Sequence, residues 1–145
     1  MEDSIDEMGP IDYLVIEWSG GAAPDGQAAP ILFDLVDRGI VRVLDFAAIA
    51  KDEDGNVTAI EIEEHADATE LSYFEGASSG LLGDDDIAEA GVALEPGSIA
   101  VLLVYENRWA GPFAAALRRS GAELVANGRI PVQALIAAVE AAEAA

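Results

Sequence analysis

The sequence predicts one α+β domain, and three observations support this. The 145 residues are the usual length of a single domain. Hydrophobic residues make up 52% of the chain, which is enough for a sizeable core. Short β-branched runs alternate with segments of helical periodicity. We therefore expect an acidic N-terminal tail over residues 1–9, followed by a single α+β domain over residues 10–145.

The first half of the chain predicts a strand, a helix and a β-hairpin. The strands are rich in β-branched and aromatic residues, and the helix repeats its apolar residues at helical spacing. Asp54-Gly55 is a strong hairpin signal, so it is expected to join the second and third strands. The predicted ranges are Ile11 to Trp18, helical Gln27 to Arg38, Ile40 to Lys51, and Val57 to Glu63.

The second half predicts three helices and two strands. Ser98 to Glu106 is apolar on both faces, which is typical of a central strand. Asn107 is expected to cap the helix that follows it. The other predicted elements are a helix from Asp84 to about Ala93, a helix ending near Ser120, a short strand from Glu123 to Ala126, and a helix opened by Pro131 with Val132, Leu135, Ile136 and Val139 on one face.

This order of elements is βαββαβ followed by αβα. The first six elements are typical of the ferredoxin-like split βαβ arrangement. We therefore predict a ferredoxin-like βαββαβ sandwich with a C-terminal αβα extension. In such a sandwich both crossover helices are expected on one face of the sheet, which leaves the other face to be covered by something else.

The charge of the chain restricts its partners. There are 28 acidic against 7 basic residues, a formal charge of −21. Such a surface repels phosphate backbones and anionic lipid, so nucleic acid and membrane surfaces are not expected as partners. A cationic protein is the natural counterpart. Cysteine is absent, and neither a signal peptide nor a run of about 18 apolar residues is seen, so we expect a cytoplasmic chain without a membrane span.

No catalytic, cofactor or metal site is predicted. His65 is the only histidine, and it lies in an acidic stretch. The Asp84-Asp85-Asp86 run is interpreted as a helix cap with acidic first turn. Asp52 to Asn56 does not have the glycine spacing of a calcium loop and is interpreted as a hairpin turn. Asp45 interrupts an apolar strand, so we expect it to point inward and to pair with Arg42.

Four segments of the chain resemble a known family. They are Leu35 to Asp45, Lys51 to Gly55, Phe74 to Gly83, and Leu94 to Ser98 with the strand after it. Together they are similar to a bacterial domain family of unknown function, itself similar to predicted glycine-zipper proteins described as membrane or stress proteins. The resemblance covers roughly Gly9 to the C-terminus. It implies a bacterial intracellular protein without an assigned reaction and supplies no catalytic residues.

The leading functional hypothesis is a non-enzymatic, self-associating protein with a role in stress implied by the resemblance. An uncovered apolar sheet face is a typical contact surface between subunits. The C-terminal helix could fold back over that face, and a second subunit is the preferred alternative. A module that binds a small molecule or a divalent cation is the second hypothesis, and an enzyme with a site in a sheet cleft is the third. The self-association candidates are Leu102, Leu103, Val104, Phe46, Gly76 and Gly80.

Overall fold

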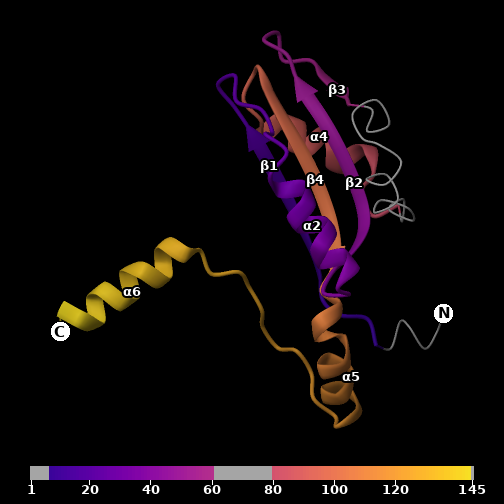
Figure 1. Ribbon diagram of the computed structural model, residues 1–145, viewed down its shortest axis with the longest axis vertical. Coiled ribbons are helices and arrows are strands. Elements are labelled where there is room, and N and C mark those ends of the chain that lie inside the picture. The colour runs from indigo at the N-terminus through magenta and orange to yellow at the C-terminus, as the bar shows by residue number, and fades with distance from the viewer. Residues whose placement is uncertain (1–6, 61–79, 145) are drawn as a thin grey trace.

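The computed structural model describes residues 7–60 and 80–144, and it confirms an α+β fold (Figure 1). Within these described ranges, a four-stranded antiparallel sheet is accompanied by four helices and one 3-10 turn. In chain order the elements are β1 (Ile11–Trp18), α2 (Ala28–Asp37), β2 (Arg42–Lys51), β3 (Val57–Ala59), α4 (Asp84–Ala93), β4 (Ser98–Glu106), η2 (Arg108–Ala110), α5 (Gly111–Arg119) and α6 (Val132–Ala144).

The strand order in the sheet is β1-β4-β2-β3. β4 therefore lies between two partners, as its two apolar faces predict. Antiparallel pairing places Leu103 opposite Leu14 of β1 and Phe46 of β2. The predicted hairpin is also confirmed, because β2 pairs with β3 from Lys51 opposite Val57 onward.

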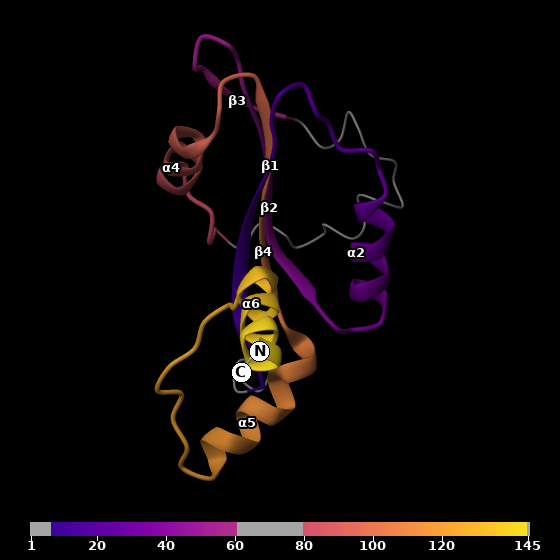
Figure 2. The ribbon, with the colours of Figure 1, turned by 90° about the vertical axis from the view of Figure 1, so that its left-hand side faces the viewer.

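One helix packs on each face of the sheet, and Figure 2 shows α2 and α4 on opposite sides of it. On the α4 face, Ile49, Ala100 and Leu102 pack with Leu94, Ile87 and Ala90. On the α2 face, Val43 and Leu103 pack with Leu32 and Val36. The expectation that both crossover helices share one face is therefore wrong, and the ferredoxin-like topology is not confirmed. The chain itself supplies a helix to each side.

A β-bulge in β2 brings three consecutive residues into the interior. The pairing with β4 shifts register between Val43 and Asp45, which leaves Leu44 as the extra residue. Val43, Leu44 and Asp45 are all buried. A regular strand would alternate its side chains between the two faces, so the bulge redirects Asp45 toward the α4 side.

The C-terminal third differs from the predicted αβα extension. The predicted strand from Glu123 to Ala126 does not form, and Val125 is 94% exposed. β-branched character favours a strand only where a sheet edge pairs with the segment, and this segment pairs with no strand of the sheet. Asn107 does not cap the helix after it, since its side chain bonds elsewhere. The chain turns through η2 before α5 begins.

The outer strand β3 is shorter than predicted. It spans Val57–Ala59, whereas the expected strand continued to Glu63. Residues 61–63 lie outside the described residues, as do His65 and Gly76. β2 begins at Arg42, two residues after its predicted start at Ile40. The backbone N–H of Ile40 donates to the carbonyl oxygen of Leu35, and the carbonyl oxygen of Ile40 accepts from Trp109, so Ile40 does not pair with a strand.

The N-terminal segment is held against the turn that precedes α5. The backbone N–H of Gly9 donates a hydrogen bond to Glu106 Oε2 over 3.0 Å. A Cβ at Gly9 would collide with the carbonyl oxygen of Asn107, and a Cβ at Gly111 would collide with that of Glu7. Both positions need glycine because two backbone segments approach here without room for a side chain.

We expect Gly9→Ala to lower the free energy of unfolding by about 1–3 kcal/mol, because the new methyl group meets backbone atoms that cannot rotate away. Thermal unfolding followed by circular dichroism measures the change. Gly128→Ala is the matched control, since a Cβ there meets nothing within 4 Å. Equal melting temperatures for Gly9→Ala and Gly128→Ala would contradict the close approach.

Candidate interaction surface

An apolar groove of about 530 Å³ lies on the α4 face, between β1 and α4. It forms because α4 covers the part of the face made by β4 and β2, while β1 lies beyond it at the edge of the sheet. Asp86 and Glu89 of α4 supply its charged side chains. The apolar lining includes Ile11, Tyr13 and Val15 of β1, Leu102 and Val104 of β4, and Leu82 before α4.

The position of α4, and hence the width of the groove, depends on polar contacts at both ends of the helix. Asp86, in the first turn of α4, accepts a hydrogen bond from the backbone N–H of Gly83, the residue before the helix, at 2.9 Å. At the other end, Lys51 Nζ donates to the carbonyl oxygens of Gly91 and Leu94 at 2.9 and 3.0 Å. A cation at a helix C-terminus satisfies open carbonyls and complements the helix dipole.

Asp45 points inward, as predicted, but Arg42 is not its partner. Its two carboxylate oxygens each accept a backbone hydrogen bond at 2.9 Å, one from Phe46 and one from Leu82. The second bond ties the segment before α4 to the bulge in β2. Arg42 instead pairs with Glu106, with Nε and Oε1 3.0 Å apart. Arg42 and Glu106 lie opposite each other on β2 and β4. The sequence of β2 alone does not show this pairing, because it depends on how the two strands align.

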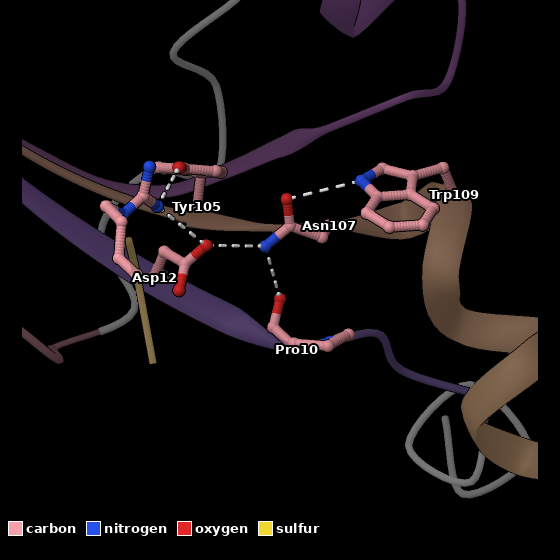
Figure 3. A network of polar contacts seen from close by, with 6 residues as sticks. Pro10, Asp12, Tyr105, Asn107 and Trp109 are labelled. Atoms are coloured by element: carbon pink, nitrogen blue, oxygen red, sulfur yellow. Dashed lines mark hydrogen bonds and ion pairs between the residues drawn. The ribbon is translucent and has the colours of Figure 1, made fainter. Parts of the chain in front are cut away.

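A polar network joins the ends of β1 and β4 to the segment between α5 and α6 (Figure 3). Asn107 Nδ2 donates to the Pro10 carbonyl at 3.0 Å and to Asp12 Oδ2 at 2.9 Å, and Trp109 Nε1 donates to Asn107 Oδ1 at 3.3 Å. Asn107 therefore fastens β1 to the turn after β4, which explains why it does not cap the helix.

Arg129 completes this network. Its Nη2 donates to the Tyr105 hydroxyl and to Asp12 Oδ2, each over 3.1 Å. The bond to Tyr105 and the charge of Asp12 raise the pKa of the Arg129 guanidinium above its ordinary value. Since α6 begins three residues later, this contact sets the point from which α6 leaves the domain.

The helix α5 exposes an apolar side and carries basic residues in its last turn. It projects beyond the end of the sheet (Figures 1 and 2). Trp109 of η2 is 66% exposed and Phe113 is 67% exposed, and Leu117 follows one helical turn later. The last turn carries Arg118 and Arg119. Trp109 is thus at the surface.

The helix α6 is exposed along its whole length, from residue 132 to residue 144. Its predicted apolar stripe exists as a helical face, because Val132, Leu135, Ile136 and Val139 all lie within α6. All four are among the exposed large hydrophobic residues of the chain. The helix does not fold back over the sheet, which is visible in Figure 1.

The predicted self-association residues of β2 and β4 are buried or half-buried within one chain. Leu102 is 2% exposed, Leu103 and Val104 are also buried, and Phe46 is half-buried. Leu102 packs under α4 and Leu103 under α2. Gly80 is exposed and a Cβ there would meet nothing within 4 Å, while Gly76 lies outside the described residues. Leu102, Leu103 and Val104 nevertheless line the groove between β1 and α4. Of the three exposed apolar surfaces, the groove, α5 and α6, the sequence signalled only the apolar stripe of α6.

The acidic residues of the β2–β3 loop make hydrogen bonds within that loop. Asp52 accepts hydrogen bonds from the backbone N–H and the side-chain amide of Asn56, at 2.8 and 3.3 Å. The backbone bond above all lowers the pKa of Asp52 below its ordinary value. These bonds join the two ends of the loop in the β2–β3 hairpin. Over residues 7–60 and 80–144, no group of three or more His, Asp or Glu side chains is placed to hold a metal ion.

The fold and surface define a small acidic α+β protein whose most conspicuous features are exposed apolar surfaces. The chain belongs to the family of unknown function DUF6325, whose model matches residues 7–144. The family has no assigned activity, so the expected membership of a domain family of unknown function is confirmed. No curated protein and no solved structure matches the chain. None of the helices in the described part of the chain is long and apolar enough to cross a membrane.

Proposed function

We propose that this protein is a non-enzymatic, self-associating protein whose apolar surfaces are covered by further copies of the same chain. The exposed stripe of α6 is the observation that carries the proposal. Four large apolar side chains on one helical face stand in water over the whole helix. A helix with such a face is stable mainly when the face packs against a partner. The role in stress that the likeness to glycine-zipper proteins implies remains part of this proposal.

A second copy is the preferred occupant because α6 is already placed to reach one. Arg129 fastens the preceding segment to Asp12 and Tyr105, and α6 then leaves the domain (Figure 1). The acidic residues of α6, Glu140 and Glu143, lie toward its C-terminal end, while Val132–Val139 carries no charge. Antiparallel pairing of two α6 helices would bring the uncharged parts together and keep the carboxylates of the two copies apart.

We expect Leu135→Glu to weaken self-association about tenfold or more, because each buried leucine contributes roughly 2 kcal/mol and a charge replaces it. Sedimentation velocity over a concentration series measures the change. Ala134→Glu is the matched control, since it adds the same charge to the same helix on the side away from the stripe. Equal association of the two variants would show that the stripe of α6 is not a contact.

A further inference from the structure

The strand β1 forms one edge of the sheet and is paired on one side only. In the described part of the chain its strand partner is β4, and this pairing runs without a bulge over the whole of β1. The other edge strand, β3, spans three residues. Proteins protect open edges with short strands, bulges, prolines or lysines, whereas β1 has eight residues and none of these devices. β1 is therefore the edge to which another strand can add.

The hydrogen-bond pattern shows which residues of β1 face the open side. In an antiparallel pair, alternate residues direct their backbone groups toward the partner strand. The backbone N–H of Asn107 donates to the Pro10 carbonyl, which continues the register of β1 with β4 by one residue. The bond from Ile60 N to Ala48 O gives the same alternation when it is followed across the sheet. The even-numbered residues of β1 therefore bond to β4, and the N–H and C=O groups that point to the open side are those of Ile11, Tyr13, Val15 and Glu17.

The open side of β1 is also apolar. Ile11, Tyr13 and Val15 lie on the α4 face, where they line the groove, and all three are exposed. The helix α6 lies on this side of the sheet in Figure 1 but does not cover the edge, since Tyr13 is 76% exposed. The edge thus offers backbone hydrogen-bonding groups together with apolar side chains, the two contributions that strand addition uses.

We propose that β1 of a second copy pairs antiparallel with β1 and extends the sheet across a two-fold axis at Leu14. This proposal rests on the proposed self-association and names one of its contacts, which does not use α6. Hydrogen-bonded pairs can form only between outward-facing residues, so odd-numbered residues of one copy pair with odd-numbered residues of the other. The register centred on Leu14 is the one that pairs all four outward-facing residues, Ile11 with Glu17 and Tyr13 with Val15.

Self-pairing suits the apolar side chains of β1. Tyr13 lies opposite Val15 of the second copy, and pairs of an aromatic with a β-branched residue stabilise antiparallel sheets. On the α2 face, Leu14 of the two copies meet at the two-fold axis, beside the Leu103 that lies opposite Leu14 in each chain. The odd-numbered side chains of both copies lie on one face of the extended sheet, so the apolar floors of the two grooves become continuous.

The acidic residues of β1 also fit a second copy. Asp12 and Glu17 differ in the direction of their backbone groups, so the hydrogen-bond pattern keeps them from lying opposite each other, and each lies opposite an isoleucine instead. Both carboxylates are bonded within their own chain, Asp12 to Arg129 at 3.1 Å and Glu17 to the backbone N–H of Glu95 at 2.7 Å. β1 therefore meets the demands of its own edge, which a strand of unrelated sequence meets only by chance.

A single cysteine tests this register, because the chain has no cysteine of its own. At the two-fold axis the Cα atoms of the two Leu14 residues lie about 4.5 Å apart, within reach of a disulfide. Ile16→Cys is the matched control for Leu14→Cys, since it lies on the same face of the same strand. The two Ile16 positions are about 13 Å apart in this register. All variants carry Leu135→Glu, so that association through α6 is weakened in every sample.

We expect Leu14→Cys to form a covalent dimer about tenfold faster than Ile16→Cys when each is oxidised with diamide at about 100 μM. Electrophoresis without reductant measures the rate. Tyr13→Cys and Val15→Cys give a second test at exposed positions, where the substitution leaves the core unchanged. These two positions lie opposite each other, so the mixture should cross-link faster than either variant alone. Equal rates in both tests, or faster cross-linking of Ile16→Cys, overturn the β1 pairing.

Sedimentation of the unaltered chain separates this result from that of the proposed function. If the unaltered chain associates and the cysteine variants do not cross-link as expected, another surface makes the contact and only the β1 pairing fails. If the unaltered chain stays monomeric at about 100 μM, both proposals fail.

Discussion

Leu102→Asp is expected to unfold the domain. Leu102 packs against α4 together with Ile49 and Ala100 in the interior of one chain. Aspartate at this position removes the apolar contacts and buries a carboxylate without a partner, which costs about 4 kcal/mol or more. Such a loss is a large part of the stability of an ordinary domain. Far-ultraviolet circular dichroism and urea unfolding measure it.

Val92→Asp is the control for this prediction. Val92 lies on α4 and is 81% exposed, so the same chemical change there should leave the fold intact. A folded Leu102→Asp chain that has merely lost its association would contradict the burial of Leu102 within one chain. That result would restore the sheet face as the contact surface between copies.

Arg42→Ala is expected to lower the free energy of unfolding by about 2–4 kcal/mol, because it leaves the buried Glu106 carboxylate without its cation. Glu106 is 5% exposed and keeps one other partner, the backbone N–H of Gly9. The Arg42 side chain is itself partly in water, so the loss should fall toward the lower end of this range. Urea unfolding of the single variant gives the value.

Two comparisons isolate the ion pair. Adding Glu106→Gln to Arg42→Ala should recover part of the loss, since the uncompensated charge is then gone. Arg38→Ala breaks the exposed Arg38–Asp34 pair on α2 and should cost less than about 1 kcal/mol. Equal losses for Arg42→Ala and Arg38→Ala would show that Glu106 does not need its cation.

Local sequence signals predicted the elements whose partners are close in the chain. The Asp54-Gly55 turn predicted the β2–β3 hairpin, because turn chemistry alone selects that pairing. The acidic run Asp84-Asp85-Asp86 predicted a helix start, and it forms the first turn of α4. The two apolar faces of Ser98–Glu106 predicted a strand between two others. Each of these depends on neighbours within a few residues or on the pattern of one strand.

The arrangement of the helices could not be predicted in this way. Both apolar faces of β4 are equally compatible with a helix on each side or with one face left open, and only the three-dimensional path of the crossovers decides between them. The partner of Arg42 depends on the β2–β4 register, and the bulge at Leu44 shifts that register. The groove arises because β1 is at the edge of the sheet beyond α4, a position that no residue of β1 encodes by itself.

Sedimentation equilibrium of the unaltered chain tests the central claim most directly. The mass of one chain is 15.1 kDa. If copies of the chain cover the exposed stripe of α6 and the open edge of β1, the average mass should rise well above that of one chain as the concentration approaches about 100 μM, the range in which a specific contact of micromolar affinity is occupied. A single species with the mass of one chain at every concentration would contradict self-association.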